Sequence, residues 1–192
     1  MKNISVLLFL LITLALNAQN NKTSGLNARQ FHKYWKVESE SPDYKVTFLG
    51  DTVEILSPKG LTLWRKEKMS GKVTIEYDAC VVVEVEGDRL SDLNCFWMAS
   101  DPQYPDNIWK REKWRSGIFL NCYSLQLYYM GYGGNHNSTT RFRRYDGNEA
   151  AITNAKARPA ILKEYTDADH LLEANKWYHI KITNENNRVS YY

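Results

Sequence analysis

The densest group of chemically useful side chains lies in residues 131–147, which read GYGGNHNSTTRFRRYDG. A glycine-rich turn ends an aromatic, strand-like run at Tyr132 and then presents His136 and Asn137. A phenol, an imidazole and an amide are side chains that transfer protons or bind polar ligands. The turn is therefore a candidate site. The alternative is that His136 is an ordinary loop histidine whose ring nitrogens already have hydrogen-bond partners.

The segment after this turn alternates as a strand does. In residues 139–145 the side chains of Arg141, Arg143 and Tyr145 share one face, because successive strand residues point to opposite sides. Two guanidinium groups and a phenol on one face suit an acidic or polyhydroxylated ligand. The alternative is a polar outer sheet face in contact with water.

These residue types meet the requirements of a polysaccharide lyase. β-Elimination at a uronic acid needs a base for the C5 proton, an acid for the leaving oxygen, and cations that neutralise the carboxylate. Tyr132 is an alternative phenol for the proton transfer, and Asn137 could hydrogen-bond the substrate carboxylate. The candidate catalytic residues are His136, Tyr145, Arg141 and Arg143.

A carbohydrate-binding module without catalysis is the main alternative. It needs aromatic rings on which sugars stack and polar side chains that reach their hydroxyl groups. Trp109 lies in residues 103–116, a charged segment that we expect to be a loop on the binding side. The candidate substrate-binding residues are Asn94, Trp97, Trp109, Tyr132 and Asn137.

A glycoside hydrolase is the further alternative, and it needs two carboxylates across the scissile bond. The best match to an E-x-D-x-E strand is Glu76-x-Asp78-x-Cys80, in which a cysteine replaces the third acid. These acids could equally cover a solvated strand face. The histidines show no metal-ligand spacing, so we expect no cofactor and no catalytic metal, although loop carboxylates could hold a structural calcium ion.

The elements that carry these residues are predicted to be β-strands. Residues 73–86, VTIEYDACVVVEVE, alternate between an apolar and a polar face. Further strand patterns include residues 177–183, and residues 166–174 form the single helix-like stretch. Short strands separated by turns predict an all-β fold, an antiparallel two-sheet sandwich of the jelly-roll kind with at most one short helix.

The N-terminus has the pattern of a secretory signal peptide. Lys2 precedes an apolar run that ends at a small-residue cleavage point, and the run is too short for a spanning helix. We predict a signal peptide at residues 1–18, a polar arm at 19–30 and one domain at 31–192. The protein is then secreted or periplasmic.

The charge balance limits the classes of partner. The formal net charge is +3, so no polybasic field favours nucleic acid or a membrane surface. We expect an acidic polysaccharide as the partner, no membrane insertion, and a monomer. Cys80, Cys95 and Cys122 cannot all pair within one chain, and buried free thiols are the expected state, with one disulfide as the alternative.

Several segments resemble known domains. Residues 177–192, WYHIKITNENNRVSYY, resemble the late hairpin of the concanavalin A-like lectin/glucanase jelly rolls. Residues 88–102, DRLSDLNCFWMASDP, and 132–147 resemble a family of secreted bacterial jelly-roll domains of unknown function found among polysaccharide-degrading proteins. The resemblance covers residues 31–192 and implies a jelly roll that acts on polysaccharides. Family members continue past this point, so we expect residues 31–192 to lack the last strand or strands.

Overall fold

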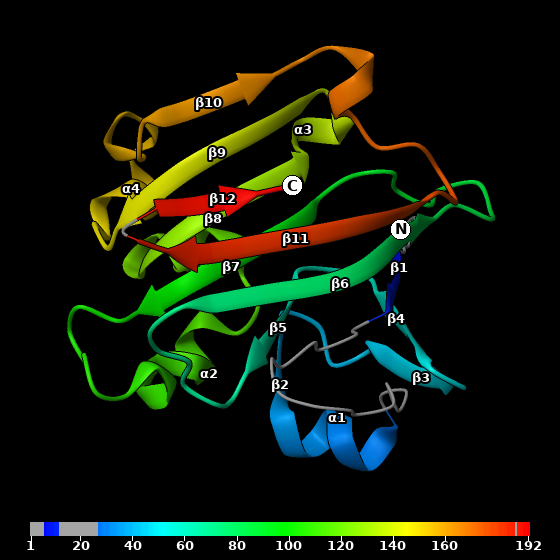
Figure 1. Ribbon diagram of the computed structural model, residues 1–192, viewed down its shortest axis with the longest axis horizontal. Helices are drawn as coiled ribbons and strands as arrows, with labels where there is room; N and C mark the ends of the chain where they lie inside the picture. Colours follow the sequence, from blue (N-terminus) through cyan, green and yellow to red (C-terminus); the bar gives the residue numbers. More distant parts are fainter. Residues whose placement is uncertain (1–5, 12–26, 187) are drawn as a thin grey trace.

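The computed structural model describes residues 6–11, 27–186 and 188–192 (Figure 1). Strands make up 44% and helices 21% of the chain, and the strand pairs are antiparallel. The predicted antiparallel β class is therefore confirmed.

Ten of the strands form two larger sheets, which pack on each other. The six-stranded sheet has the order β12 (Arg188–Tyr191), β11 (Trp177–Glu185), β6 (Val73–Val82), β1 (Val6–Leu11), β4 (Thr52–Ser57) and β3 (Lys45–Leu49). The four-stranded sheet has the order β10 (Ile161–Tyr165), β9 (Thr139–Asp146), β8 (Gln126–Gly133) and β7 (Leu93–Ser100). A separate two-stranded sheet pairs β2 (Trp35–Ser39) with β5 (Leu61–Arg65).

The alternation predicted for residues 73–86 explains how the two larger sheets pack. Tyr77, Ala79 and Val81 point inward from β6 and are buried with Trp97 and Met130 of the four-stranded sheet. In Figure 1, β6 and β11 accordingly lie in front of β7 and β8. Burial of this apolar surface is the main force that holds the sheets together.

Two further apolar clusters lie outside this core. One joins β4 to the β2–β5 pair and to Phe31, which is 1% exposed. The other lies on the outer face of the four-stranded sheet, where Trp64 of β5 covers Tyr129 and Tyr145. This second cluster borders the candidate site.

The expectation of at most one short helix was wrong. The structure has several short helices, namely α1 (Ala28–Tyr34), α2 (Glu112–Arg115), α3 (Gly134–Asn137), α4 (Ala150–Thr153), and the 3-10 turns η1 (Ile108–Arg111), η2 (Phe119–Ser124), η3 (Ala155–Ala157) and η4 (Ala168–His170). Helix α1 also includes residues 28–30 of the predicted polar arm. It begins with a capping box in which Asn27 and Gln30 bond each other's backbone, a signal visible in the sequence.

Two element assignments also differ from the prediction. Residues 166–174 contain the short turn η4 in place of a full helix. The sequence pattern of residues 117–132 predicts one long strand or two short strands, but the strand β8 begins at Gln126, after η2. Local apolar patterns of a few residues do not distinguish a strand from a buried helical turn.

The signal peptide prediction falls mostly outside the described residues and stays a prediction. The backbone of residues 6–11 is the exception, because it forms β1 between β4 and β6. Within the described part of the chain, no helix has the length and hydropathy needed to span a membrane.

Candidate functional site

A cavity of about 1220 Å³ borders β5, β7 and the outer face of the four-stranded sheet. Its polar end is lined by Asn94, Gly131, Arg141 and Arg143, and Trp109 lines it from the η1 turn. Six of the predicted site residues thus line the cavity: the two arginines, Asn94 and Trp109, together with Trp97 and Tyr145, which are both buried.

Strand register places the polar residues in rows across the sheet. Asn94 of β7 pairs with Gly131 of β8, and Gly131 pairs with Arg141 of β9. In the next row, Tyr129 of β8 pairs with Arg143 of β9. Residues directly opposite each other share a face, so these side chains meet on the outer side of the sheet.

Tyr129 lies at the centre of this group. Its hydroxyl donates a hydrogen bond to Oδ1 of Asn94 at 3.2 Å. Burial raises the pKa of Tyr129, the negative charge of Asp92 raises it further, and the charges of Arg143 and Arg141 oppose these effects. The phenol is therefore neutral in ordinary buffers, and it can donate a proton or a hydrogen bond.

Gly131 makes room for this arrangement. A Cβ at position 131 would lie 2.6 Å from Cζ of Tyr129, far inside van der Waals contact. The absence of a side chain in the Asn94–Arg141 row therefore allows the tyrosine ring to lie along the sheet surface.

The two arginines differ in their partners. Nε of Arg141 donates to Oε1 of Glu164 on β10 at 2.6 Å, so a carboxylate already compensates its charge. Nη1 of Arg143 donates to the carbonyl oxygen of Pro159. A carbonyl carries no net charge, and Arg143 is thus the better placed of the two to attract an anionic ligand.

The charged residues that line the cavity are mainly basic. Among the described lining residues, eight are Lys or Arg and four are Asp or Glu. The basic residues are Lys59, Arg65, Lys66, Lys68, Arg89, Arg141, Arg143 and Arg158, and the acidic residues are Glu67, Glu76, Asp92 and Asp106. This balance favours anions within the cavity, although the chain as a whole is close to neutral.

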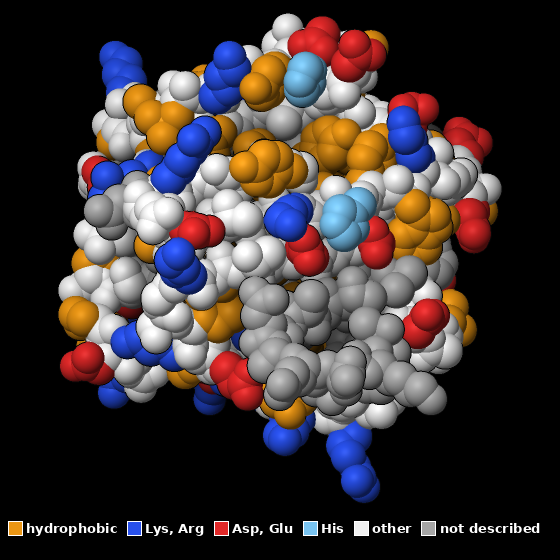
Figure 2. Space-filling view, in the orientation of Figure 1, with side chains coloured by type: hydrophobic (Ala, Val, Ile, Leu, Met, Phe, Trp, Pro, Cys, Tyr) orange, Lys and Arg blue, Asp and Glu red, His pale blue; other side chains and the backbone are white. Residues whose placement is uncertain are grey.

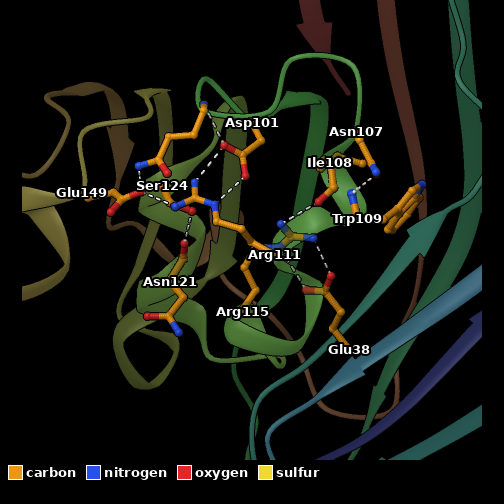
Figure 3. Close-up of polar contacts among 11 residues, drawn as sticks. Glu38, Asp101, Asn107, Ile108, Trp109, Arg111, Arg115, Asn121, Ser124 and Glu149 are labelled. Atoms are coloured by element: carbon orange, nitrogen blue, oxygen red, sulfur yellow. Dashed lines mark hydrogen bonds and ion pairs between the residues drawn. The ribbon is translucent and has the colours of Figure 1, made fainter.

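Two ion-pair networks hold the segment that carries Trp109 (Figure 3). Arg115 is fully buried; it donates from Nη2 to Glu38 at 2.6 Å and from Nη1 to the carbonyl oxygen of Ile108 at 2.8 Å. Arg111 binds Asp101 through two hydrogen bonds of 2.8 Å each. The predicted loop at residues 103–116 is therefore tied to β2 and to the end of β7.

The sequence model of the family described as Domain of unknown function (DUF6250) matches residues 55–192, from β4 to the end of the chain. The chain belongs to this family. The match includes all of the polar rows described above. Searches among curated proteins and among solved structures give no match.

Several predicted site residues of this DUF6250 domain lie away from the polar rows. His136 is exposed on the α3 turn, in a left-handed conformation with φ 58°, and is not among the described residues that line the cavity. Tyr145 is 1% exposed, packed against Tyr123 and Tyr129 in the outer cluster, and burial raises its pKa. Their catalytic roles stay predictions.

The side chains of three predicted binding residues make contacts within the protein. These residues are Trp97, Tyr132 and Asn137. Trp97 is 5% exposed and stacks on Phe142 in the core between the sheets. The ring of Tyr132 meets Tyr178 edge to face. The Asn137 amide accepts from the Leu172 N–H at 2.8 Å and donates to the Leu172 carbonyl at 2.8 Å. These contacts stabilise the packing around the turn.

The acids considered for hydrolysis lie on the outer face of the six-stranded sheet. Glu76 forms an ion pair with Lys181 at 2.7 Å, and Asp78 contacts His179 at 2.9 Å. The hydrogen bond from Lys181 lowers the pKa of Glu76. Figure 2 shows basic and acidic side chains next to each other over this face, as expected for a solvated surface.

The described residues contain neither a disulfide nor a cluster of metal ligands. Cys80, Cys95 and Cys122 are free thiols. Within the described residues, no group of three or more His, Cys, Asp or Glu is arranged to hold a metal ion.

Tyr129 is the residue that the sequence reasoning missed. Strand parity contained the signal, because Tyr129 and Gly131 have the same parity in β8, opposite to Tyr132. The choice between the tyrosines of this strand required its pairing register with β7 and β9.

Proposed function

We propose that this DUF6250 domain is a secreted, concanavalin A-like jelly roll that binds an acidic polysaccharide. The site is the outer face of the four-stranded sheet, around Arg141, Arg143, Asn94 and Tyr129. Uronic-acid units would place their carboxylates on the guanidinium groups, and sugar hydroxyls would bond the amide and the phenol. Trp109 would supply an aromatic wall for a neighbouring unit.

The observation that carries this proposal is the position of Arg143. It lies in the row of Tyr129, in a cavity where basic lining residues outnumber acidic ones, and its guanidinium donates a hydrogen bond to a neutral carbonyl oxygen. A guanidinium group binds a carboxylate through two parallel hydrogen bonds, which gives both charge and geometric selectivity.

Binding is tested by gel retardation and calorimetry with polygalacturonate, polyglucuronate and alginate, compared with neutral glucans and xylans. Arg143→Met should weaken binding of the acidic glycans by roughly tenfold or more, since hydrogen bonds to charged groups contribute about 1.5–3 kcal/mol. Arg144 is a matched control, because it is exposed on the opposite face of the same strand and lies over Tyr128.

Arg144→Met should leave the affinity unchanged. Binding should also weaken as salt is added, because the charges are partly exposed. Equal affinity for neutral and acidic glycans, or equal effects of the two arginine substitutions, would contradict the proposal.

A lyase is the second candidate, favoured by one observation: the Tyr129 phenol, kept protonated by burial, lies beside two guanidinium groups. Such a phenol could protonate the leaving oxygen while the arginines neutralise the uronate, and the carboxylate of Asp92, which also lines the cavity, would take the C5 proton to complete the elimination. The assay measures absorbance of unsaturated uronides and reducing ends separately. Tyr129→Phe should abolish unsaturated product while binding is retained. Reducing ends without unsaturated product would indicate hydrolysis instead.

A further inference from the structure

We propose that Arg158 and Arg143 together bind two neighbouring carboxylates of one polysaccharide chain, so that contiguous uronic-acid units are the preferred ligand. Arg158 lies on the loop between η3 and β10 and lines the cavity. This inference rests on the proposed binding of acidic polysaccharides. It adds a second anion contact to that site and defines the charge pattern of the ligand.

The direction of the strands places Arg158 beyond Arg143 along β9. In the antiparallel pair of β9 and β10, Arg143 lies opposite Ile161. The residues that precede Ile161 therefore extend toward the C-terminal end of β9, where Figure 1 shows the chain turning through α4 before it returns in β10. Nη1 of Arg143 donates to the carbonyl oxygen of Pro159, the residue next to Arg158, and this bond holds the loop beside β9.

Two tyrosines lie between the two arginines. Tyr145 is two positions after Arg143 in β9, so their side chains share the outer face of the sheet. The ring centroids of Tyr145 and Tyr123 are 4.8 Å apart, and the guanidinium of Arg158 lies over the Tyr123 ring at 5.7 Å from its centroid. All four residues line the cavity, so they form one wall of it.

Neither of these two guanidinium groups forms an ion pair with a carboxylate of the described residues. Arg143 donates to a peptide carbonyl, and Arg158 contacts the face of a tyrosine ring. Arg141, two positions before Arg143 on the same face, differs because Glu164 pairs with it. A cation without a counter-ion gains more from a ligand carboxylate than a cation that is already paired. The uncompensated positive charge of this wall thus lies at Arg143 and Arg158.

Arg158 can contact a ligand without any change in the fold. It is exposed, whereas Tyr123 beneath it is 5% exposed, so the guanidinium covers the ring while Arg158 stays accessible. A planar guanidinium can stack on an aromatic ring and still direct N–H groups outward from its edge. Stacking also limits the positions of the long side chain, which lowers the entropy lost when the side chain binds an anion.

The spacing along β9 favours carboxylates on consecutive sugar units. Residues i and i+2 of a strand are about 6.8 Å apart, and Arg143 and Tyr145 mark one such step. Arg158 lies at the far end of this step, over the tyrosine that packs against Tyr145. The step is comparable to the length of one sugar unit, so a glycan with alternating charged and neutral units would offer this pair only one carboxylate. We therefore expect the polysaccharide to run along β9, with contiguous uronates over the two arginines.

The test compares glycans that differ in the spacing of their carboxylates. Polygalacturonate, polyglucuronate and alginate carry a carboxylate on every unit, and hyaluronan carries one on every second unit. Calorimetry with the full chain should show that Arg158→Met weakens binding of the contiguous polyuronates by about threefold to tenfold and of hyaluronan by less than about twofold. The loss should be smaller than that caused by Arg143→Met, because Arg158 is exposed and its charge is screened by solvent.

Lys156→Met is the matched control. Lys156 is an exposed cation of η3, two positions before Arg158, and is not among the described residues that line the cavity. Its replacement removes the same charge from the same segment and should leave every affinity unchanged. Arg158→Met should also keep Tm within about 4 °C of the value for the unmodified chain, because an exposed cation–π contact contributes little to stability.

The results separate this inference from the proposed function. If Arg143→Met weakens polyuronate binding and Arg158→Met does not, the second anion contact is refuted while the proposed function stands. If no polyuronate binds, or if neither replacement matters, both fail. Equal losses for hyaluronan and the contiguous polyuronates, or equal effects of Lys156→Met and Arg158→Met, would indicate a general charge effect and overturn the role of Arg158.

Discussion

Replacing Arg115 by methionine should destabilise the protein more than any surface charge removal. The guanidinium is fully buried, binds both oxygens of Glu38 at 2.6 and 3.2 Å, and donates to the carbonyl oxygen of Ile108. It also lies over the Trp64 ring at 5.8 Å. The contact joins α2 to β2 across 77 positions of the chain, so its loss releases the segment that carries Trp109.

The expected cost follows from the burial of the partner. Removing Arg115 leaves the Glu38 carboxylate, which is 5% exposed, without its counter-ion. Breaking a buried pair on one side costs about 3–5 kcal/mol, and in a domain of this size each kcal/mol lowers Tm by roughly 2–4 °C. Arg115→Met should thus lower Tm by roughly 6–20 °C.

Guanidinium chloride unfolding and calorimetry measure this cost, with Lys72→Met as the matched control. Lys72 pairs with Glu185 at 2.8 Å, but both side chains are largely exposed, and such pairs contribute about 0–1 kcal/mol. The double variant Glu38→Leu with Arg115→Met should recover part of the loss, because it leaves no buried charge. If Arg115→Met and Lys72→Met cost the same, the pair does not hold the segment.

Three further changes test the packing and the site. Gly131→Ala should push Tyr129 off the sheet, weaken glycan binding and cost about 1–3 kcal/mol of unfolding free energy, measured by calorimetry and denaturation. Asn137→Ala should cost about 1–3 kcal/mol through the lost bonds to Leu172, while glycan affinity stays unchanged in the same gels. Burial raises the pKa of the Cys122 thiol from 9.0 to about 12, so the unfolded state loses its proton first and stability should fall from pH 9 upward by about 1.4 kcal/mol per unit. Cys122→Ala should reduce this slope in denaturation midpoints measured between pH 7 and roughly 11.

The strand pattern was largely predictable because it depends on local alternation. The period of two predicts strands at residues 73–86 and 177–183, and β6 and β11 lie there, although β6 ends at Val82. The faces of β9 were also predicted, since Arg141 and Arg143 line the cavity while Phe142 packs in the core. Parity within one strand needs no knowledge of the rest of the fold.

The composition of the site was less predictable because it depends on register and on loop positions. His136 and Arg141 are five positions apart, yet the turn directs the histidine to the surface while the strand carries the arginine into the cavity. Tyr129 and Asn94 meet although 35 positions separate them. Which residues of β7 and β8 face each other follows from tertiary pairing, whose register shifts between Trp97 and Ser100, and not from local pattern.

Strand β7 supports the proposed glycan site through one side chain. Asn94 on its outer face accepts the hydrogen bond of the Tyr129 hydroxyl at 3.2 Å. Among the described strands, β7 pairs with β8 alone, and a strand paired on one side opens more easily than a strand paired on both, because fewer backbone hydrogen bonds hold it. A glycan that bonds both Asn94 and Tyr129 would therefore restrict the motion of β7 as it binds, and the entropy lost in that ordering would offset part of the binding free energy. The affinity of the site thus depends on how well β7 is held against β8 before the sugar arrives.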